Sequence, residues 1–300
     1  MINIISKTKY AYTFSIVLTI LCILSLSVWG LKYDIDFTSG TLMKIKFADN
    51  LPAKTEIEDT LKDLNLGSLI IQASDGNVLM VRYASEDDKI NDEVWNKIQA
   101  KYENATQQSV DFINPAVSTE LKKKSLNAIF LSIFAIMAYI AWAFRKVSRP
   151  VESWKYGVGA VIALAHDILI TAGVFSVLGH FYGIEVGIPF IAALLTILGF
   201  SVHDTIVVYD RTRENLLRGS SKTPFQEVVN KSLNETLVRS INTSMTVIIT
   251  LLAIYIFGGA TIKYFALALL VGITFGTYSS IFIASALLVT SYELTMKYKK

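Results

Sequence analysis

Long apolar stretches alternate with short polar segments along most of the chain. Six stretches are long enough to cross a bilayer, which takes about 20 residues; they cover residues 11–30, 125–144, 154–178, 188–208, 241–257 and 265–290. The first stretch is too long for the core of a signal peptide, and no Ala-x-Ala cleavage site follows it. An uncleaved anchor is therefore favoured over a cleaved signal. The pattern predicts an α-helical polytopic membrane protein with six transmembrane helices.

A polar region of mixed charge, residues 31–124, separates the first two apolar stretches. Its periodicity predicts a strand over 41–48, a helix over 52–64, strands over 68–73 and 78–83 joined by a turn at 75–77, a helix over 85–102 and a strand over 107–113. Ser85 is the expected N-cap of the second helix. The order β-α-β-β-α-β is typical of a ferredoxin-like α+β domain.

Composition supports a membrane protein and narrows the function. Apolar residues make up 52% of the 300 residues and charged residues only 18%, with a mean hydropathy of +0.46, which excludes a disordered chain and a fully soluble one. A net charge of +3 is too small for a nucleic-acid binder. The single cysteine, Cys22, can form neither an intrachain disulfide nor a cysteine metal site. No metal cluster, phosphate loop or nucleophile–base set is visible, so we expect no cofactor and no enzymatic role.

The distribution of Lys and Arg predicts the orientation. The segments before the first span, between spans 2 and 3, between spans 4 and 5 and after span 6 carry most of the basic residues outside the large loop. The positive-inside rule therefore places both termini in the cytoplasm. Lys122–Lys124 break the rule locally, but long loops cross regardless of charge. The expected organisation is an anchor at 1–30, an extracytoplasmic domain at 31–124 and five further helices at 125–300, with a cytoplasmic helical loop at 209–240.

Two acidic residues lie inside predicted spans. Placing an ionisable group in a membrane costs free energy, and such groups are usually functional. Asp167 follows His166 near the middle of the third span, and Asp204 lies about one turn inside the cytoplasmic end of the fourth. Asp167 could move a proton or only lock helix packing, and Asp204 could be merely interfacial. Ser201, three residues before Asp204, gives that helix a polar stripe.

A basic residue opens the fifth span. Arg239 is followed by Asn242, Thr243 and Thr246 at spacings of three, four and seven, which form a polar stripe on an apolar helix. In one interpretation, Arg239 simply extends its guanidinium to the membrane–water interface. Alternatively, it pairs with Asp204 when that carboxylate is ionised and is released when a proton binds. Such a pair would be a proton-linked two-state element.

Four segments resemble the SecF side of the SecD/SecF family of protein-export membrane proteins, in the resistance-nodulation-division superfamily. They are Asp34–Thr41, Ala163–Asp167, Gly199–Asn215 and Ser232–Ser244, and the last two are long and specific. The resemblance covers almost the whole chain. The first family motif usually ends in two glycines, where this chain has Ser39 and Gly40.

The resemblance implies a fold and a function. It implies six spans, a ferredoxin-like outer domain, a SecD-like six-span partner, association with the SecYEG channel, and use of the proton gradient to draw unfolded preproteins across the bacterial plasma membrane. In that family a span-4 Asp and a span-5 Arg are the proton-linked pair, matching Asp204 and Arg239. Without a second six-span block, this chain resembles a separate SecF subunit. A non-energised scaffold of the translocon and half of a proton-driven small-molecule exporter are the alternatives.

Overall fold

The chain folds into two compact units. A computed structural model describes residues 2–48, 50–64, 66, 69–74, 76–83, 85, 87–145, 151–218 and 223–298. Met1–Lys32 and Asn127–Lys300 form one unit, here called the helical unit, and Tyr33–Leu126 form the other, the sheet unit. Six helical stretches among the described residues are long and apolar enough to cross a membrane: Ile5–Val28, Pro115–Ala143, Ser153–Tyr182, Ile188–Arg218, Phe225–Phe257 and Ile262–Lys297.

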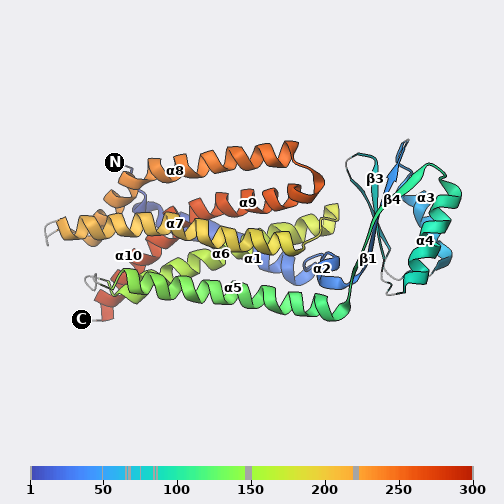
Figure 1. The fold of residues 1–300 in the computed structure, drawn as a ribbon. Helices are drawn as coiled ribbons and strands as arrows, with labels where there is room; N and C mark the ends of the chain where they lie inside the picture. Colours follow the sequence, from blue (N-terminus) through green and yellow to red (C-terminus); the bar gives the residue numbers. More distant parts are fainter. Residues whose placement is uncertain are drawn as a thin grey trace. The chain divides into compact units, whose positions relative to one another are not determined.

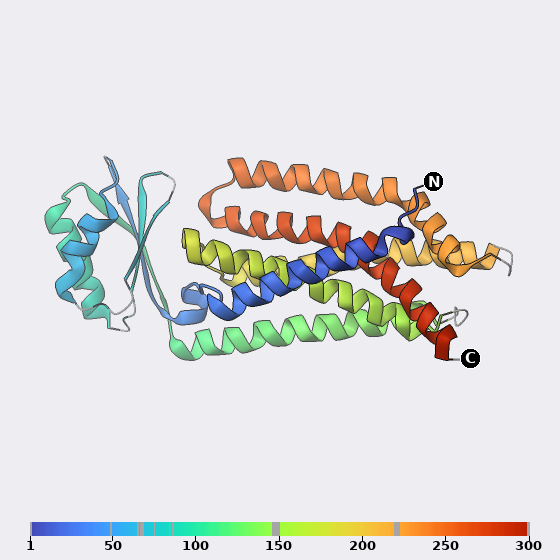
Figure 2. The same ribbon diagram turned by 180° about the vertical axis from the view of Figure 1, so that it is seen from behind.

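The helical unit is made of long helices that run side by side (Figure 1). Their bounds are α1 Thr8–Val28, after a 3-10 turn at Ile5–Lys7, α5 Pro115–Ala143, α6 Ser153–Tyr182, α7 Ile188–Arg218, α8 Phe225–Phe257, α9 Ala260–Ser279 and α10 Ser285–Tyr298. A π-helical turn, Ser280–Ala284, joins α9 to α10. The start of α1 and the end of α10 lie at the same end of this unit (Figures 1 and 2). We call it the terminal end.

Three of the crossing stretches form the centre of the helical unit. In α6, α7 and the α9–α10 stretch, 44–56% of the residues of the most apolar window are buried, against 6–17% in α1, α5 and α8. The central stretches are therefore enclosed by protein to a much greater extent than the outer helices. The outer helices leave apolar side chains for lipid or for a partner to cover, because large exposed apolar faces are unfavourable in water.

The six predicted spans are confirmed, although most of the helices are longer than predicted. The predicted loop 209–240 is largely continuous helix, because α7 runs on to Arg218 and α8 already begins at Phe225. The helical character of this loop was predicted, but its continuity with spans 4 and 5 was not: the apolar stretches end at 208 and begin at 241, and a helix outside the apolar zone needs no apolar face all round. The predicted sixth span is interrupted by the π turn.

Small residues allow the central helices to approach closely. A Cβ atom added to Gly272 of α9 would lie 2.1 Å from Cδ1 of Ile197 in α7, and one added to Gly173 of α6 would lie 2.4 Å from Cβ of Cys22 in α1. Contacts this short leave no room for a side chain. Close approach through glycine is the usual way in which membrane helices pack, and here it fixes α7 against α9 and α1 against α6.

The sheet unit is a four-stranded antiparallel sheet with two helices on one face (Figure 1). Its elements are α2 Ile35–Thr38, β1 Gly40–Phe47, α3 Lys54–Leu61, a 3-10 turn at Lys62–Leu64, β2 Ile70–Ser74, β3 Val78–Tyr83, α4 Asp88–Lys101 and β4 Ala105–Ile113. The strand order is β2-β3-β1-β4, and every neighbouring pair is antiparallel. Met43, Ile45 and Val81 of the sheet pack against Ile57 and Ile98 of the helices.

Most predicted elements of the sheet unit occur with shifted ends. The strand over 78–83 is observed as predicted, whereas β4 begins at Ala105 instead of residue 107. Ser85 was the wrong N-cap: Asp87 caps α4 by accepting a hydrogen bond from the Lys89 amide, and the Ser85 hydroxyl accepts one from the Asp87 amide. Residues 68 and 75, at the ends of a predicted strand and turn, lie outside the described residues.

The first family motif forms a short anchored turn in the sheet unit. Asp34 caps α2 through the Ile35 amide, and its carboxylate forms an ion pair of 2.5 Å with Arg82 of β3. Burial lowers the pKa of the Arg82 guanidinium, and the negative charges of Asp34 and Asp36 act in the opposite direction. The motif therefore fixes the entry of β1 against β3 through a mostly buried charge pair.

The two positions at which the family usually has glycine both adopt positive φ. Gly40 has φ 118°, and Ser39 has φ 64° and ψ 170°, a region that is nearly exclusive to glycine. Ser39→Gly should therefore stabilise the sheet unit by about 1 kcal/mol, because the relief of strain exceeds the added chain entropy. Pulse proteolysis of the intact chain in detergent measures this difference. Thr38→Gly, inside α2, is the control and should destabilise; equal stability of the Ser39→Gly variant and the parent would contradict the prediction.

Candidate functional site in the helical unit

Asp204 is buried on α7, against α8. The residue is 3% exposed, and the Ser244 hydroxyl donates to its Oδ2 at 3.4 Å. Ser244 also shares a hydrogen bond of 2.6 Å with Thr277 of α9. Among the described residues, no side-chain nitrogen of Lys, Arg or His lies within 4.0 Å of the carboxyl oxygens. The Asp204 carboxyl is therefore bonded to a neutral hydroxyl and not held in an ion pair, which suits a group that gains and loses a proton.

Asp167 is the second buried carboxyl group, and it joins three helices. It is fully buried on α6 and receives the Ser201 hydroxyl of α7 at 2.6 Å and the Ser279 hydroxyl of α9 at 2.8 Å, both on Oδ2. Its Oδ1 lies 3.0 Å from Nδ1 of His166. The sequence grouped Ser201 with Asp204, but the structure places its hydroxyl on Asp167 instead. The acid therefore holds α6, α7 and α9 together through short hydrogen bonds.

The π turn follows Ser279, which bonds to Asp167, and contacts α7 at the residue after Asp204. Ser280 shares a hydrogen bond of 2.9 Å with Thr205 of α7 and donates to the carbonyl of Gly276. Ser285 donates across the turn to the Ser280 carbonyl at 3.1 Å. A π turn interrupts the regular ladder of backbone hydrogen bonds, and hydroxyl groups satisfy the carbonyls that it leaves. Such turns are frequent at functional sites, and this one is the least regular part of the helical core.

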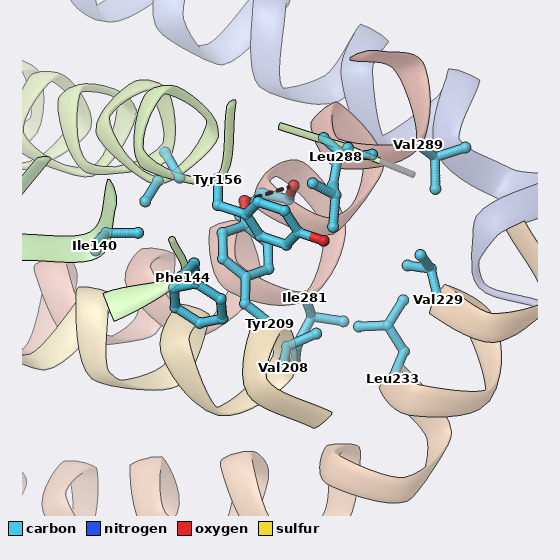
Figure 3. Close-up of a cluster of buried hydrophobic side chains, with 14 of the residues drawn as sticks. Ile140, Phe144, Tyr156, Val208, Tyr209, Val229, Leu233, Ile281, Leu288 and Val289 are labelled. Atoms are coloured by element: carbon cyan, nitrogen blue, oxygen red, sulfur yellow. Dashed lines mark hydrogen bonds between the residues drawn. The ribbon is translucent and has the colours of Figure 1, made fainter. Parts of the chain in front are cut away.

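A tightly packed apolar cluster closes the terminal end of the site (Figure 3). Tyr209 is fully buried against Tyr156 and Phe144, with ring centroids 5.2 and 6.2 Å away. Its hydroxyl donates to the carbonyl of Ala284 in the π turn at 3.0 Å, the dashed line in Figure 3. Leu233 of α8 lies in the same cluster. The cluster therefore packs α6, α7 and α8 against the π turn on the terminal side of Asp204.

Arg239 lies on an exposed face of α8 and is not paired with Asp204 in this structure. Among the described residues its guanidinium forms neither an ion pair nor a hydrogen bond. Asn242, Thr243 and Thr246 are exposed on the same face, and the two threonine hydroxyls donate to carbonyls of their own helix at 2.9 and 2.8 Å. The predicted stripe therefore exists, but it points away from the helical core.

A second polar stripe of α8, which the sequence analysis missed, faces the core. Ser232, Thr236, Ser240 and Ser244 are all buried and recur at intervals of four residues, which places them on one face of a helix. The spacing is visible in the sequence. The spacing alone does not predict burial, because serine and threonine hydroxyls can donate to carbonyls of their own helix, as Ser232 and Thr236 do.

The two longest family segments meet again at the terminal end. Arg211 of α7 donates to Glu235 of α8 at 2.6 Å and also pairs with Glu214. Asn215 donates to Glu235 at 2.7 Å and to the Ser232 hydroxyl at 2.9 Å. These bonds tie the end of α7 to the start of α8. Reading one residue at a time could not reveal them, since the partners lie about 20 residues apart in the sequence.

The fold and the site together define a class of protein. Six helical stretches suited to cross a membrane bury two carboxyl groups at their centre, and groups of three or more potential metal ligands are absent from the described residues. Ionisable groups held inside such helices mark transport and proton pathways more often than structure alone. The class is that of polytopic membrane proteins with an ionisable core.

Comparisons with known proteins identify the family. The family model described as "Protein export membrane protein SecD/SecF, C-terminal" matches residues 93–294. The chain is 42% identical to the protein translocase subunit SecF of Thermobaculum terrenum, covering 97% of this chain and 94% of that protein. It is 37% identical to the same subunit of Anaerolinea thermophila, covering 96% and 94%. The chain belongs to the SecD/SecF family of protein-export membrane proteins.

Solved structures agree with this assignment. The crystal structure of SecDF from Thermus, described as a translocon-associated membrane protein, matches with a TM-score of 0.84 at 33% identity and covers 96% of this chain. SecDF in a super-membrane-facing form matches with a TM-score of 0.71 at 34% identity and covers 99%. This chain spans only 38–39% of the length of those two SecDF chains.

Proposed function

We propose that the chain is a SecF-like subunit of the Sec export machinery that, together with a SecD-like six-span partner, uses the proton gradient to promote the passage of unfolded preproteins across the bacterial plasma membrane. Its relatives are named as translocase subunits. The observation that carries the proton-linked role is Asp204: a buried carboxyl group on a crossing helix, bonded to a neutral hydroxyl and without a bound cation among the described residues. The role is transport, not catalysis, and protons are the coupling ion.

The charge of Asp204 is the quantity that would switch. A buried carboxylate without a counter-charge is far more costly than the neutral acid. Loss of the proton would therefore draw the Arg239 guanidinium from the exposed face of α8 towards α7, and proton binding would release it. In this account the observed arrangement, with Arg239 unpaired, corresponds to the protonated acid. Asp167 is a second, weaker candidate for proton coupling, because its three hydrogen bonds also give it a packing role.

The available energy limits what this switch can do. One charge that crosses 100 mV contributes about 2.3 kcal/mol. That free energy shifts an equilibrium about fifty-fold, at about 1.4 kcal/mol for each factor of ten. A single proton can thus bias two nearly balanced conformations, but it cannot unfold a stable domain of about 5–15 kcal/mol. We therefore expect the machinery to bias the movement of chains that are already unfolded.

The exposed polar face of α8 supports the proposal that this helix contacts a partner subunit within the membrane. Arg239, Asn242, Thr243 and Thr246 would be costly against lipid, whereas the neighbouring exposed face with Ile241 and Leu252 is apolar. A six-span SecD-like subunit is the occupant that the SecDF relatives suggest. The apolar face would contact lipid.

Tryptophan at position 246 should therefore break the association with the SecD-like partner. Thr246→Trp adds bulk to the polar face, and we expect co-purification of the partner to fall at least five-fold. Ile241→Trp, about one and a half turns earlier on the apolar face, is the matched control and should leave the complex intact. Affinity purification from detergent-solubilised membranes measures both. Equal recovery of the partner with the two variants would assign the interface to another face.

The sheet unit is proposed to be a ferredoxin-like domain outside the cytoplasm, with both chain termini inside. Its order of elements and its antiparallel strand order β2-β3-β1-β4 support the ferredoxin-like assignment. Basic residues at the terminal end, among them Lys7, Arg211 and Arg218, support the orientation through the positive-inside rule. In this arrangement the sheet unit would contact the emerging preprotein, and the subunit pair would associate with the SecYEG channel.

Export from membrane vesicles tests the proposed function. Translocation of a preprotein is started with ATP, ATP is then removed, and further movement is followed with the proton gradient intact or collapsed by a protonophore. We expect vesicles that contain the chain and its partner to continue in the presence of the gradient and to stop without it. Vesicles that lack the chain are the control. Equal movement with and without the chain would contradict the proposal.

A further inference from the structure

The first residues of the chain are held by two asparagine side chains of α8. Asn234 accepts a hydrogen bond from the Ile2 amide at 2.8 Å and donates to the Ile2 carbonyl, also at 2.8 Å. Asn230 accepts from the Ile4 and Ile5 amides at 2.8 and 3.3 Å and donates to the Ile2 carbonyl at 3.1 Å. Residues 2–5 thus lie along α8 near its start at the terminal end of the unit (Figure 2). We call these five hydrogen bonds the asparagine clamp.

The clamp recognises backbone, and asparagine is the residue that suits it. An asparagine amide carries both an acceptor and two donors, so one side chain can bind an N–H and a C=O of the same segment. Asn234 does this with Ile2 alone. Asn230 and Asn234 are one helical turn apart, so they present their amides on the same face of α8. Neither residue is required by the packing of the apolar core, which α8 supplies through Val229 and Leu233.

A second, separate attachment holds the same segment of chain. Further along α1, Cys22 lies against Gly173 of α6. The Ser25 hydroxyl donates to the Gly173 carbonyl at 3.2 Å, and the Ser176 hydroxyl donates back to the Ser25 carbonyl at 3.0 Å. The chain from residue 2 to residue 28 is therefore fixed to α8 at its start and to α6 near its end. Between these attachments α1 is also bonded to the α9–α10 stretch, where Tyr278 donates to the Ala11 carbonyl at 3.1 Å and Tyr12 shares a hydrogen bond of 3.1 Å with Thr290. A shift of α8 relative to α6 would therefore act on the start of α1.

From these two attachments we infer that Asn230 and Asn234 are positioning residues that make α1 follow α8 during protein export. This inference rests on the proposed function, in which a change at Asp204 and Arg239 moves α8. Arg239 lies nine residues after Asn230, about 13 Å along the helix axis, so the clamp and Arg239 share one continuous helix. In the chain, α1 leads directly into the sheet unit. The clamp thus gives the switch a covalently continuous route to that unit.

Removal of the clamp tests the inference. In the Asn230→Ala/Asn234→Ala variant we expect gradient-driven export to fall at least five-fold, while the membrane level of the chain and the co-purified partner stay unchanged. Asn3→Ala is the matched control, since Asn3 bonds only to Ser6 in the next turn. If the double variant exports at the parent rate with the gradient present, the inferred role of the clamp is wrong, and the proposed function is unaffected. Gradient-independent export by the parent chain would overturn the proposed function itself.

A covalent rescue separates mechanical linkage from folding. Cys22 is the only cysteine and can be replaced by serine, so two new thiols can be joined selectively. Ile4→Cys/Asn230→Cys/Asn234→Ala lacks the clamp and should export slowly. A short bifunctional thiol reagent that links positions 4 and 230 should restore at least half of the parent rate, whereas a monofunctional reagent should not. Full crosslinking without any recovery would show that the two asparagines do not act through this attachment, and the inference would fail.

Discussion

Asp204→Asn should abolish the gradient-driven part of export while leaving the chain folded and bound to its partner. Asparagine has nearly the same size as aspartate, and its side-chain oxygen can still accept the hydrogen bond from Ser244. It cannot release a proton, so the fifty-fold bias that about 2.3 kcal/mol can supply is lost. Secretion of a reporter in cells that carry only this variant, together with co-purification of the SecD-like subunit, measures the effect.

Two further variants separate the charge of Asp204 from its surroundings. Asp210→Asn changes an exposed acid six residues later on the same helix, and we expect secretion at the parent rate. Ser244→Ala removes the hydroxyl donor but keeps the carboxyl group, and we expect a smaller loss than with Asp204→Asn. If Asp204→Asn secretes normally with an intact complex, the carboxyl group serves only in packing. The chain would then be a scaffold of the translocon and not a proton-driven subunit.

The membrane helices could be predicted from the sequence because their signal is local. A stretch of about 20 apolar residues has few other structural solutions, and all six predicted spans are present. The ends of the helices could not be predicted in the same way. The apolar pattern does not indicate that the predicted helical loop 209–240 continues α7 and α8 without a break at the span ends, and nothing in the sixth span indicates the π turn at Ser280–Ala284. Tertiary packing decides both.

The site could be predicted only in its ionisable members. Asp167 and Asp204 stand out because acids inside apolar stretches are expensive. Their hydrogen-bond partners come from other helices, for instance Ser244 and Ser279. A single sequence gives no indication of which distant residues are in contact. Periodicity also gave α8 one polar face when it has two. The direction of each face depends on neighbouring helices and not on spacing alone.

Asp167 should be essential to the stability of the helical core, beyond any role in proton coupling. In Asp167→Leu the hydroxyls of Ser201 and Ser279 and the His166 ring nitrogen lose their acceptor inside the protein. A buried donor without a partner costs about 1–3 kcal/mol in soluble proteins, and hydrogen bonds between membrane helices average about 0.6 kcal/mol. For three donors we expect the free energy of unfolding to fall by about 2–5 kcal/mol. Unfolding of the purified complex by heat or SDS in detergent measures it.

Asp167→Asn separates hydrogen bonding from charge at the same position. The amide oxygen can accept both serine hydroxyls, and a change of tautomer lets Nδ1 of His166 accept from the amide nitrogen, so we expect stability within about 1 kcal/mol of the parent. Thr171→Val, which removes a buried hydroxyl from the same helix, is the control for small polar losses. If the leucine and asparagine variants are equally stable, Asp167 does not hold the three helices together. If the asparagine variant is stable but slow in gradient-driven export, the acid also exchanges a proton, and the helical unit has two coupled sites, Asp167 at the meeting of α6, α7 and α9 and Asp204 on the side of α7 that faces α8.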